Sequence, residues 1–242
     1  MSKLYTRRGD GFQTSLLSGG QRPKDNNLIN AIGSLDSLNS AIGITCSHLR
    51  HHIYTNNYNK LYYIIGASTT LPPVYYWLYC YSFITMVIFG PMTTFLLYML
   101  YKKIFNMNVE YQFRKTSYRL ASIARTIFKV SSALADPEKR YHNIQSEARK
   151  RANVKQLEDW IDELTTLVPE LNRFILPTGH IIGSLLHDCR SRTREAERNL
   201  AACDDIDDNI KAYINRLSDY MFQTARLINY VTGHFDNWVD PE

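Results

Sequence analysis

Three arginines recur at every fourth residue in the last third of the chain: Arg190, Arg194 and Arg198. In a helix this spacing stacks the three guanidinium groups along one side. Guanidinium forks match the geometry of phosphate oxygens and keep their charge at physiological pH. The spacing alone more often belongs to a solvated helix face, on which Glu195 and Glu197 pair locally. The arrangement therefore indicates either a phosphate site or an ordinary exposed surface.

The opening 25 residues are polar and rich in glycine, and we expect them to form a loop. Gly9 and Gly20 would let backbone N–H groups approach an anion, while Thr14 and Lys24 add a hydroxyl and a cation. The GxxxxGKS/T phosphate-binding pattern is absent, so the usual nucleotide-loop interpretation does not apply. Taken by itself, the segment is more typical of a surface loop.

Apolar residues recur at steps of three and four over five stretches, which predicts amphipathic helices. The predicted helices cover 26–50, 118–136, 157–171, a stretch from about His180, and 210–228. We expect the charged stretch 138–152 to be a loop. Asp136 and Pro137 should end the second helix, and aspartates at 204, 205 and 207 favour the start of the last. The pattern predicts an all-α fold, a five-helix bundle with short connections.

Charge and cysteine content exclude several classes of function. The net charge of +5 is mild and mixed in sign along the chain, which argues against a nucleic-acid partner. The four cysteines are far apart in sequence: Cys46, Cys80, Cys189 and Cys203. They indicate neither a disulfide framework nor a zinc site. His48, His51 and His52 suit the end of the first helix, where positive charge meets the dipole, so we expect no metal site.

One long segment differs from the rest of the chain. Residues 61–101 contain no charged side chain, and Lys102 and Lys103 follow directly. By length the segment could cross a bilayer, with its tyrosines and its tryptophan at the interfaces. Prolines at 72, 73 and 91 would kink or shorten any such span. Residues 61–108 therefore form a long hydrophobic insertion between the first and second predicted helices.

Several motifs occur together in an order that is similar to that of one protein family. The chain resembles the PduO-type ATP:cob(I)alamin adenosyltransferases over residues 4–50 and 118–232. The most specific motifs are FILP at 174–177, the HxxR…R…AER pattern at 187–198 and NRLSDY at 215–220. Their conjunction favours an enzyme, although each motif alone is also compatible with an ordinary helix face or loop.

The resemblance implies a single cobalamin adenosyltransferase-like domain over 1–242, assembling as a homotrimer with active sites between subunits. Its substrates would be ATP with Mg²⁺ and reduced cobalamin. The chain would be a transferase that moves the 5′-deoxyadenosyl group of ATP to cob(I)alamin, giving adenosylcobalamin and triphosphate. Because cobalt(I) is itself the nucleophile, the protein has to align the reacting atoms and neutralise the leaving triphosphate. A reductase and a cobalamin-dependent acceptor enzyme are implied partners.

The resemblance also assigns roles to residues. Arg190 and Arg194 match arginines near the corrinoid–ATP junction and the phosphates, and Asp36 would pair with Arg190. Phe174 matches an aromatic residue that crowds the lower face of the corrin, which excludes a lower axial ligand and makes cobalt(II) easier to reduce. Glu197 would lie near the nucleotide or its metal. The implied ATP-binding positions are Thr6, Gly9, Thr14, Lys24, Arg194, Glu197, Arg198 and Asn215.

Some positions depart from the family pattern. Gly11 and Phe12 stand where the family has Lys and Gly, so a phosphate-binding lysine is missing and a tight turn loses its glycine. Ser37 replaces a carboxylate beside Asp36. Glu195 replaces an arginine and reverses a charge close to the triphosphate. These changes favour an alternative function, a protein that binds and delivers adenosylcobalamin with weak or no catalysis.

The insertion at 61–108 has no counterpart in the family and is open to three interpretations. It could be a membrane hairpin, an apolar loop packed on the bundle, or translated intervening sequence; we favour the last, with the hairpin second. A membrane-anchored interaction protein is the corresponding third hypothesis for function. Intervening sequence would imply a eukaryotic chain, and eukaryotic members of the family act in mitochondria. A bacterial chain would be cytoplasmic.

We predict that the chain binds ATP more weakly than a typical member of the family. The double substitution Gly11→Lys and Glu195→Arg should lower the ATP dissociation constant, because it restores positive charge near the triphosphate. Titration calorimetry with ATP measures this directly. A dissociation constant that does not fall would contradict the prediction.

Overall fold

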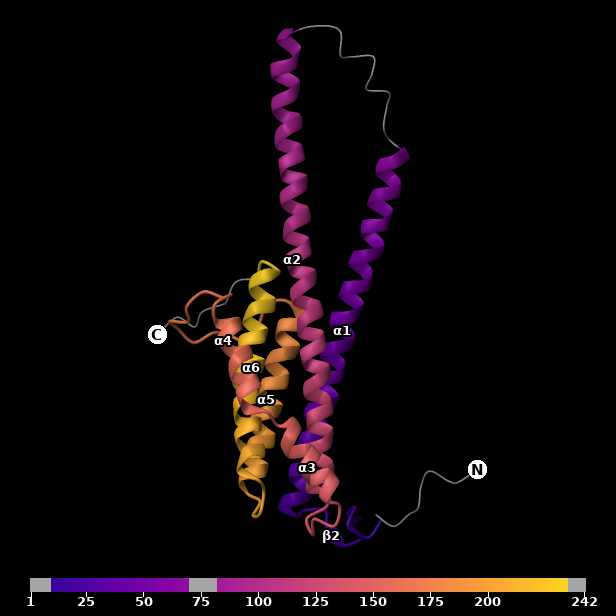
Figure 1. Cartoon of the computed structure of the whole chain (residues 1–242), viewed down its shortest axis with the longest axis vertical. Helices are drawn as coiled ribbons and strands as arrows, with labels where there is room; N and C mark the ends of the chain where they lie inside the picture. Colours follow the sequence, from indigo (N-terminus) through magenta and orange to yellow (C-terminus); the bar gives the residue numbers. More distant parts are fainter. Residues whose placement is uncertain (1–9, 70–81, 235–242) are drawn as a thin grey trace, which may run out of the picture. The chain divides into compact units, whose positions relative to one another are not determined.

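The computed structural model describes residues 10–69 and 82–234 (Figure 1), with side chains described outside 56–96 and 101–107. Its elements are β1 (Gln13–Ser15), β2 (Gln21–Pro23), α1 (Asn27–Thr69), α2 (Ser82–Leu134), α3 (His142–Arg151), α4 (Val154–Thr165), α5 (Ile181–Ala201) and α6 (Asp208–Val231). The chain divides into two compact units. One comprises 1–47 and 116–242, and the other comprises 48–115.

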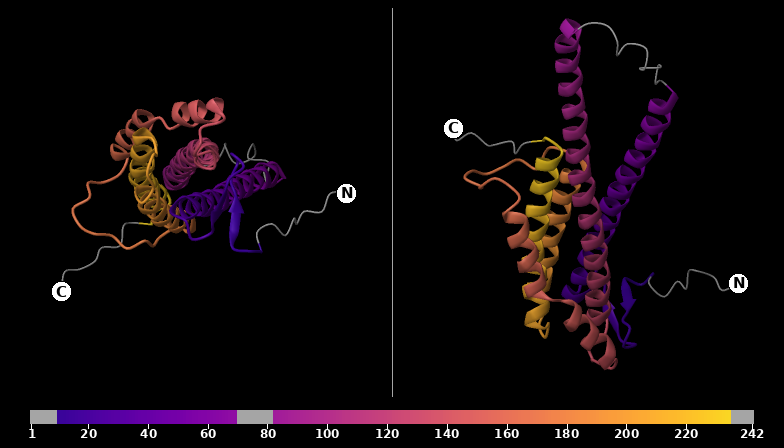
Figure 2. Two further views of the ribbon diagram at one scale, coloured as in Figure 1. Left: turned by 90° about the horizontal axis from the view of Figure 1, so that it is seen from below. Right: turned by 45° about the horizontal axis from the view of Figure 1, so that its top comes forward.

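The first unit is a helical bundle, which confirms the predicted all-α class. α5 and α6 pack side by side along their lengths, and α4 packs against α6 (Figures 1 and 2). Fully buried apolar residues recur at helical spacing in α1 and α6: Leu35, Leu38, Ile42, Ile214, Leu217, Met221, Ala225 and Ile228. Burial of each Leu, Ile or Met in this set stabilises the fold by about 1.5–3 kcal/mol, so the apolar stripes determine which face of each helix is left exposed.

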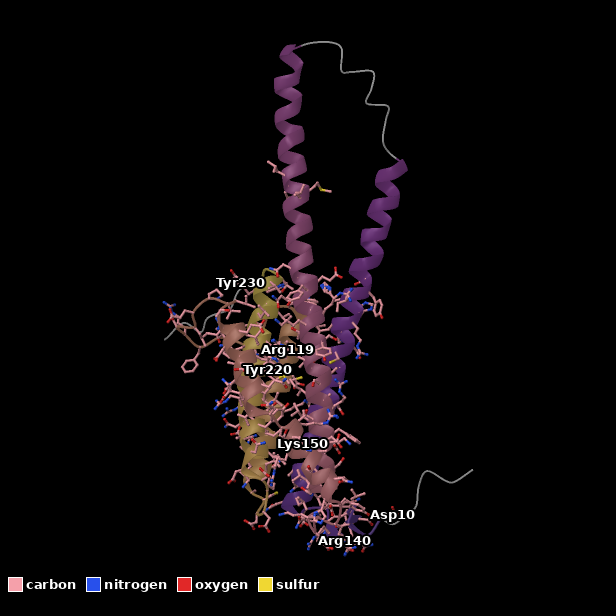
Figure 3. All side chains as sticks on the ribbon, viewed as in Figure 1. Asp10, Arg119, Arg140, Lys150, Tyr220 and Tyr230 are labelled. Carbon is pink, nitrogen blue, oxygen red and sulfur yellow. The ribbon has the colours of Figure 1, made fainter. Side chains whose placement is uncertain are left out.

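A polar cluster joins α2, α4 and α6 within the bundle. Arg119 is buried and donates to the Glu163 carboxylate at 2.5 Å. Its guanidinium carbon also lies 4.7 Å from the centre of the Trp160 ring. Trp160 in turn lies 5.6 Å from the ring of Tyr220, and Figure 3 labels Arg119 and Tyr220. Burial raises the pKa of Tyr220 to about 12, so this phenol stays neutral.

The prediction of a loop over 138–152 is wrong, because α3 occupies most of it. Only Ala148 of α3 is buried, so the helix has no apolar stripe for a sequence pattern to reveal. Ion pairs hold α3 in place instead. Glu147 pairs with Lys129 of α2 at 2.9 Å, and Arg149 pairs with Asp207 at 2.5 Å. The described residues thus contain six helices where we predicted five.

The prediction of a plain loop over residues 1–25 is also wrong where the structure describes it. β1 and β2 pair antiparallel, with Gln13 opposite Pro23. Gly19 adopts a φ of 89° in the turn, a conformation that glycine accepts without strain. The backbone N–H of Leu17 donates to Ala135 O at 2.9 Å and fixes the hairpin to the end of α2. Strands of three residues are too short for alternation to appear in the sequence.

Helix boundaries differ from the prediction in three places. α1 continues to Thr69 and α2 begins at Ser82, so both helices extend well beyond the predicted 26–50 and 118–136. α2 continues through Pro91, where we expected a break. α4 ends at Thr165, although the apolar pattern extended the prediction to 171. Apolar spacing therefore located the helices better than their ends.

Two predicted helix boundaries are confirmed. α2 ends at Leu134, just before Asp136 and Pro137. Asp136 is completely buried and accepts hydrogen bonds from the backbone N–H groups of Arg140 at 3.1 Å and Tyr141 at 2.8 Å. At the start of α6, the side chain of Asp207 accepts from Asn209 N at 2.9 Å, as an N-cap residue should.

The second unit contains the histidines at the end of the predicted first helix. The His52 ring lies 4.7 Å from the ring of Phe113, and burial, with a smaller effect of His51, lowers the pKa of His52. Leu97 and Tyr98 are both more than half exposed, as is Tyr111. Over the part of the chain that the structure describes, no helix combines the length and the apolar character that a membrane span requires.

Asp136→Ala should lower the free energy of unfolding by about 1–3 kcal/mol, because the backbone N–H groups of Arg140 and Tyr141 lose a buried, charged acceptor. Glu138→Ala is the matched control, since Glu138 makes an exposed pair with Arg140 that contributes about 0–1 kcal/mol. Urea denaturation of both variants gives the comparison. Equal losses for the two variants would contradict this role of Asp136.

Candidate functional site

The arginine helix predicted from spacing is α5, and its packing turns the arginines outward. One stripe of α5 is buried in the bundle: Ile182, Leu186, Cys189, Thr193, Ala196 and Leu200. Arg194 and Arg198 fall between these positions and are exposed. Arg190 is half-buried, and its guanidinium carbon lies 5.2 Å from the centre of the Phe222 ring of α6. α5 therefore presents two cations to solvent and a third held by an aromatic ring.

Two of the predicted nucleotide residues meet where α5 packs on α6. The side-chain amide of Asn215 donates to the Glu197 carboxylate at 2.6 Å. They line a pocket of about 270 Å³ together with Lys211 and the apolar Leu200. A carboxylate, an amide and an ammonium around an apolar floor can hold a polar ring or a sugar. No sequence motif had singled out Lys211, which lies one helical turn before Asn215.

Asp36 is exposed on α1 and accepts a hydrogen bond from Ser131 Oγ of α2 at 3.3 Å. The neighbouring Ser37 accepts from the Arg192 guanidinium of α5 at 2.5 Å. The predicted pair between Asp36 and Arg190 is not among the ion pairs of the described residues of this single chain. The structure instead joins the Asp36 helix to the arginine helix through Arg192.

Arg192 is not one of the three arginines that recur at every fourth residue, so the sequence pattern did not single it out. It also donates to the Asp188 carboxylate at 2.8 Å, and this bond is the main reason that its pKa is raised. Glu195 makes a smaller electrostatic contribution in the same direction. The negative charge of Glu195 is thus partly compensated by a cation three residues earlier on the same helix.

The opening hairpin carries two further predicted positions. Thr14 lies half-buried on β1, and Lys24 is exposed just after β2. The backbone N–H of Lys24 donates to Phe12 O at 2.9 Å. Thr6 and Gly9 lie outside the described residues. Arg140 extends toward the hairpin turn, with a guanidinium nitrogen 4.0 Å from where a Cβ on Gly19 would lie, and so adds a cation that we did not predict.

The prediction that Phe12 occupies a glycine-like position is confirmed. Phe12 has a φ of 57°, in the left-handed region that a bulky side chain rarely adopts, and its side chain is 80% exposed. No described packing compensates for this conformation. The conformation is therefore a cost that the hairpin carries at the position where the family has glycine.

Phe174 lies in the segment between α4 and α5 and is 89% exposed. An aromatic side chain this exposed is available for a ligand or a partner. Its segment contacts α6 through the buried side chains of Arg226 and Asn229, neither of which belongs to a motif recognised in the sequence. The sequence could have indicated Arg226 and Asn229 only by their polar side chains, which interrupt the apolar residues on the buried face of α6.

A larger cavity, of about 1130 Å³, lies between the start of α1, the end of α2, α3 and the α5–α6 connection. Its lining includes Lys139, His142 and Lys150 as well as Asp204 and Asp205. None of the predicted site residues that the structure describes borders this cavity. The two cysteines near the arginine motif are buried, and burial raises the pKa of the Cys189 thiol to about 11, which argues against nucleophilic chemistry there.

Comparison with known proteins identifies the class to which this fold and site belong. The family model for cobalamin adenosyltransferase matches residues 4–67 and 97–228, and the chain belongs to that family. The human corrinoid adenosyltransferase MMAB is 30% identical over 229 residues, covering 93% of this chain and 68% of the human protein. The corrinoid adenosyltransferase of Bacillus subtilis is 28% identical over 235 residues, covering 96% and 89%.

A solved structure has the same fold. It is a variant PduO-type ATP:corrinoid adenosyltransferase from Lactobacillus reuteri, complexed with cobalamin and ATP. The two chains align with a TM-score of 0.63 and 24% identity, over 98% of this chain and 96% of the other. Between residues 4 and 228, the family model leaves only 68–96 unmatched. The prediction that the whole of 61–108 has no counterpart in the family is therefore too wide, because 61–67 and 97–108 match the model.

Phe12→Gly should raise the free energy of unfolding by about 0.5–1 kcal/mol. The left-handed conformation costs a non-glycine residue about 1–2 kcal/mol, and the greater chain entropy of unfolded glycine offsets part of this gain. Gln13→Gly, in the adjacent strand, is the control and should be destabilising. Thermal denaturation distinguishes them, and a Phe12→Gly variant that loses as much stability as Gln13→Gly would disprove the explanation.

Proposed function

We infer that this chain is an enzyme that transfers the 5′-deoxyadenosyl group of ATP to cob(I)alamin, producing adenosylcobalamin and triphosphate. The observation that carries this function is the family match, which extends through the arginine helix α5 and through Asn215 of α6. The outward arginines and the contact between Glu197 and Asn215 supply groups suited to a nucleotide. The name of the human relative gives a corrinoid as the substrate, and that of the Lactobacillus reuteri enzyme gives both ATP and a corrinoid.

The reaction requires positioning and charge neutralisation by the protein. Cobalt(I) of the substrate attacks the 5′ carbon of ATP, the carbon–cobalt bond forms, and the bond to the triphosphate oxygen breaks. Arg194 and Arg198 are exposed on one side of α5 and would neutralise the triphosphate as it leaves. Arg190, held against Phe222, would lie at the corrinoid–ATP junction. Thr6, Gly9, Thr14 and Lys24 of the opening segment would contact the phosphates.

Mg²⁺ is proposed to accompany ATP, with Glu197 as its protein ligand. A single carboxylate fits, because Mg²⁺ usually binds one or two carboxylates together with substrate phosphates and waters. No group of three or more His, Cys, Asp or Glu side chains within the described residues could hold an ion alone. When bound, the ion would supply positive charge to the triphosphate, while Asn215 orients Glu197 through its 2.6 Å hydrogen bond.

Cobalamin is proposed to bind against Phe174. The nearly complete exposure of this ring supports a role in contacting a large apolar ligand. By excluding a lower axial ligand, Phe174 would make cobalt(II) easier to reduce. A reductase would supply the electron, and a cobalamin-dependent enzyme would receive the product.

A homotrimer with active sites between subunits is part of the same proposal. In one chain Asp36 is bonded to Ser131, and Arg190 lies against Phe222. A pair between Asp36 of one subunit and Arg190 of a neighbour would complete the site and direct Arg190. Size-exclusion chromatography with light scattering measures the assembly state.

We further propose that 1–242 is one adenosyltransferase domain with an apolar insertion at 61–108. The unmatched stretch 68–96 supports an insertion within these bounds, although the family model matches 61–67 and 97–108. The proposed compartment is the mitochondrion for a eukaryotic chain and the cytoplasm for a bacterial one. A delivery protein with weak catalysis is the second candidate function, supported by the strained Phe12 and by Glu195, and the absence of turnover despite tight cobalamin binding would favour it.

Arg194→Met should raise the ATP dissociation constant by roughly 10- to 100-fold, since a hydrogen bond to a charged group contributes about 1.5–3 kcal/mol. Lys155→Met on α4 is the control, because it also removes one positive charge, from an exposed pair with Asp159. Titration calorimetry with ATP measures the dissociation constant of both variants. Equal effects would mean that Arg194 acts only through net charge and would contradict its proposed role.

A further inference from the structure

The segment 166–180, which carries Phe174, is tied to α6 at both of its ends. Near its start, Arg226 Nη2 donates to Pro169 O at 2.7 Å. Near its end, Asn229 Nδ2 donates to Thr178 O at 2.8 Å. Arg226 and Asn229 are each only 2% exposed and lie one helical turn apart on α6. Two buried polar side chains of one helix therefore hold the segment on either side of its exposed ring.

Asn229 makes a second bond that fixes the start of α5. Its Oδ1 accepts from the backbone N–H of His180 at 3.0 Å, immediately before the first residue of α5. The side chain of His180 then accepts from Ile182 N at 3.2 Å and caps the helix. The Asn229 amide thus donates to the segment and accepts from His180, the N-cap residue of the arginine helix α5.

Two glycines leave the space that the Asn229 side chain occupies. A Cβ on Gly179 would lie 2.6 Å from Nδ2 and Oδ1 of Asn229, and a Cβ on Gly183 would lie 2.1 Å from Oδ1. Gly179 also has a φ of 114°, which other residues rarely adopt. The Asn229 side chain of α6 therefore packs closely against both the Gly179 turn and the first helical turn of α5. This packing holds the Gly179 turn in one defined position.

An apolar residue would serve α6 better if packing alone were required. The neighbouring positions Leu227, Ile228 and Val231 are buried and apolar, and a buried amide or guanidinium is unfavourable unless its hydrogen bonds are made. Arg226 donates at 3.3 Å to Gln223 Oε1 within α6, but the shorter bonds of Arg226 and Asn229 go outside the helix, to Pro169, Thr178 and His180. The polar character of these two positions thus serves the placement of the segment.

We propose that Arg226 and Asn229 are positioning residues for the corrinoid half of the site, which preset the Phe174 segment before cobalamin binds. This inference rests on the proposed function. It is specific to one substrate, because Arg194 lies 14 residues beyond His180 on α5, about 21 Å away along the helix axis. Loss of the ties should therefore weaken cobalamin binding and leave ATP binding unchanged.

The test uses the full chain and the variant Asn229→Leu, which keeps the branched shape of the side chain and removes both bonds. We expect the cobalamin dissociation constant to rise about tenfold or more, since a displacement of about 1 Å in a positioned group has large effects. The ATP dissociation constant should change by less than about twofold. Electron paramagnetic resonance of bound cob(II)alamin should show a smaller fraction lacking a lower axial ligand.

Two further variants keep the test informative. Asn229→Asp retains the acceptor for His180 N–H and loses only the donor to Thr178 O. It should show the same selective loss of cobalamin affinity, and it replaces Asn229→Leu in the test if that variant does not fold. Thr224→Val is the matched control, because it removes a buried bond to Tyr220 O within α6 that does not reach the segment. It should leave cobalamin binding and the resonance spectrum as in the parent chain.

The outcomes separate this inference from the proposed function. A folded Asn229 variant with parental cobalamin affinity and spectrum would overturn the positioning role alone, as would an equal loss of ATP affinity. A parent chain that binds no cobalamin would overturn the proposed function and this inference together. A selective loss on the cobalamin side, absent in Thr224→Val, supports the inference.

Discussion

The packing of α5 against its neighbours is the constraint on which the rest of the site depends. Ile182, Leu186 and Leu200 are at most 1% exposed, and this stripe determines how α5 is rotated about its axis. Once the rotation is set, residues at the intervening positions must face away from the core. Arg194 and Arg198 are therefore outward because apolar burial elsewhere on the helix leaves them no other direction. The hydrophobic burial of α5 therefore determines where the charged groups of the site lie.

Polar bonds across the bundle then determine details that apolar packing leaves open. Arg192 connects α5 to Ser37, beside Asp36, and Asn229 connects α6 to the start of α5. Apolar contacts tolerate small sliding and rotation, whereas a hydrogen bond restricts both distance and direction. The site can be understood as a set of helices placed by burial and brought into register by a few buried or half-buried polar side chains.

The sequence was most informative where apolar spacing is long and regular. α5 and α6 could be predicted because each has a stripe over several turns, and the exposed arginines followed from it. α3 could not, since ion pairs such as Glu147 with Lys129 hold it and only Ala148 is buried. The hairpin was missed because three-residue strands show no alternation. Asn229 and Arg226 were missed because their role depends on backbone carbonyls some 50 residues away, which no local pattern encodes.

The most direct test of the proposed reaction is to follow the transferred carbon itself. ATP labelled with carbon-13 at its 5′ carbon would be incubated with the protein and reduced cobalamin, and the products examined by nuclear magnetic resonance. We predict that the label becomes bonded to cobalt, with one intact triphosphate released for each adenosylcobalamin formed. Label that stays in ATP, or phosphate and diphosphate in place of triphosphate, would contradict the proposed reaction.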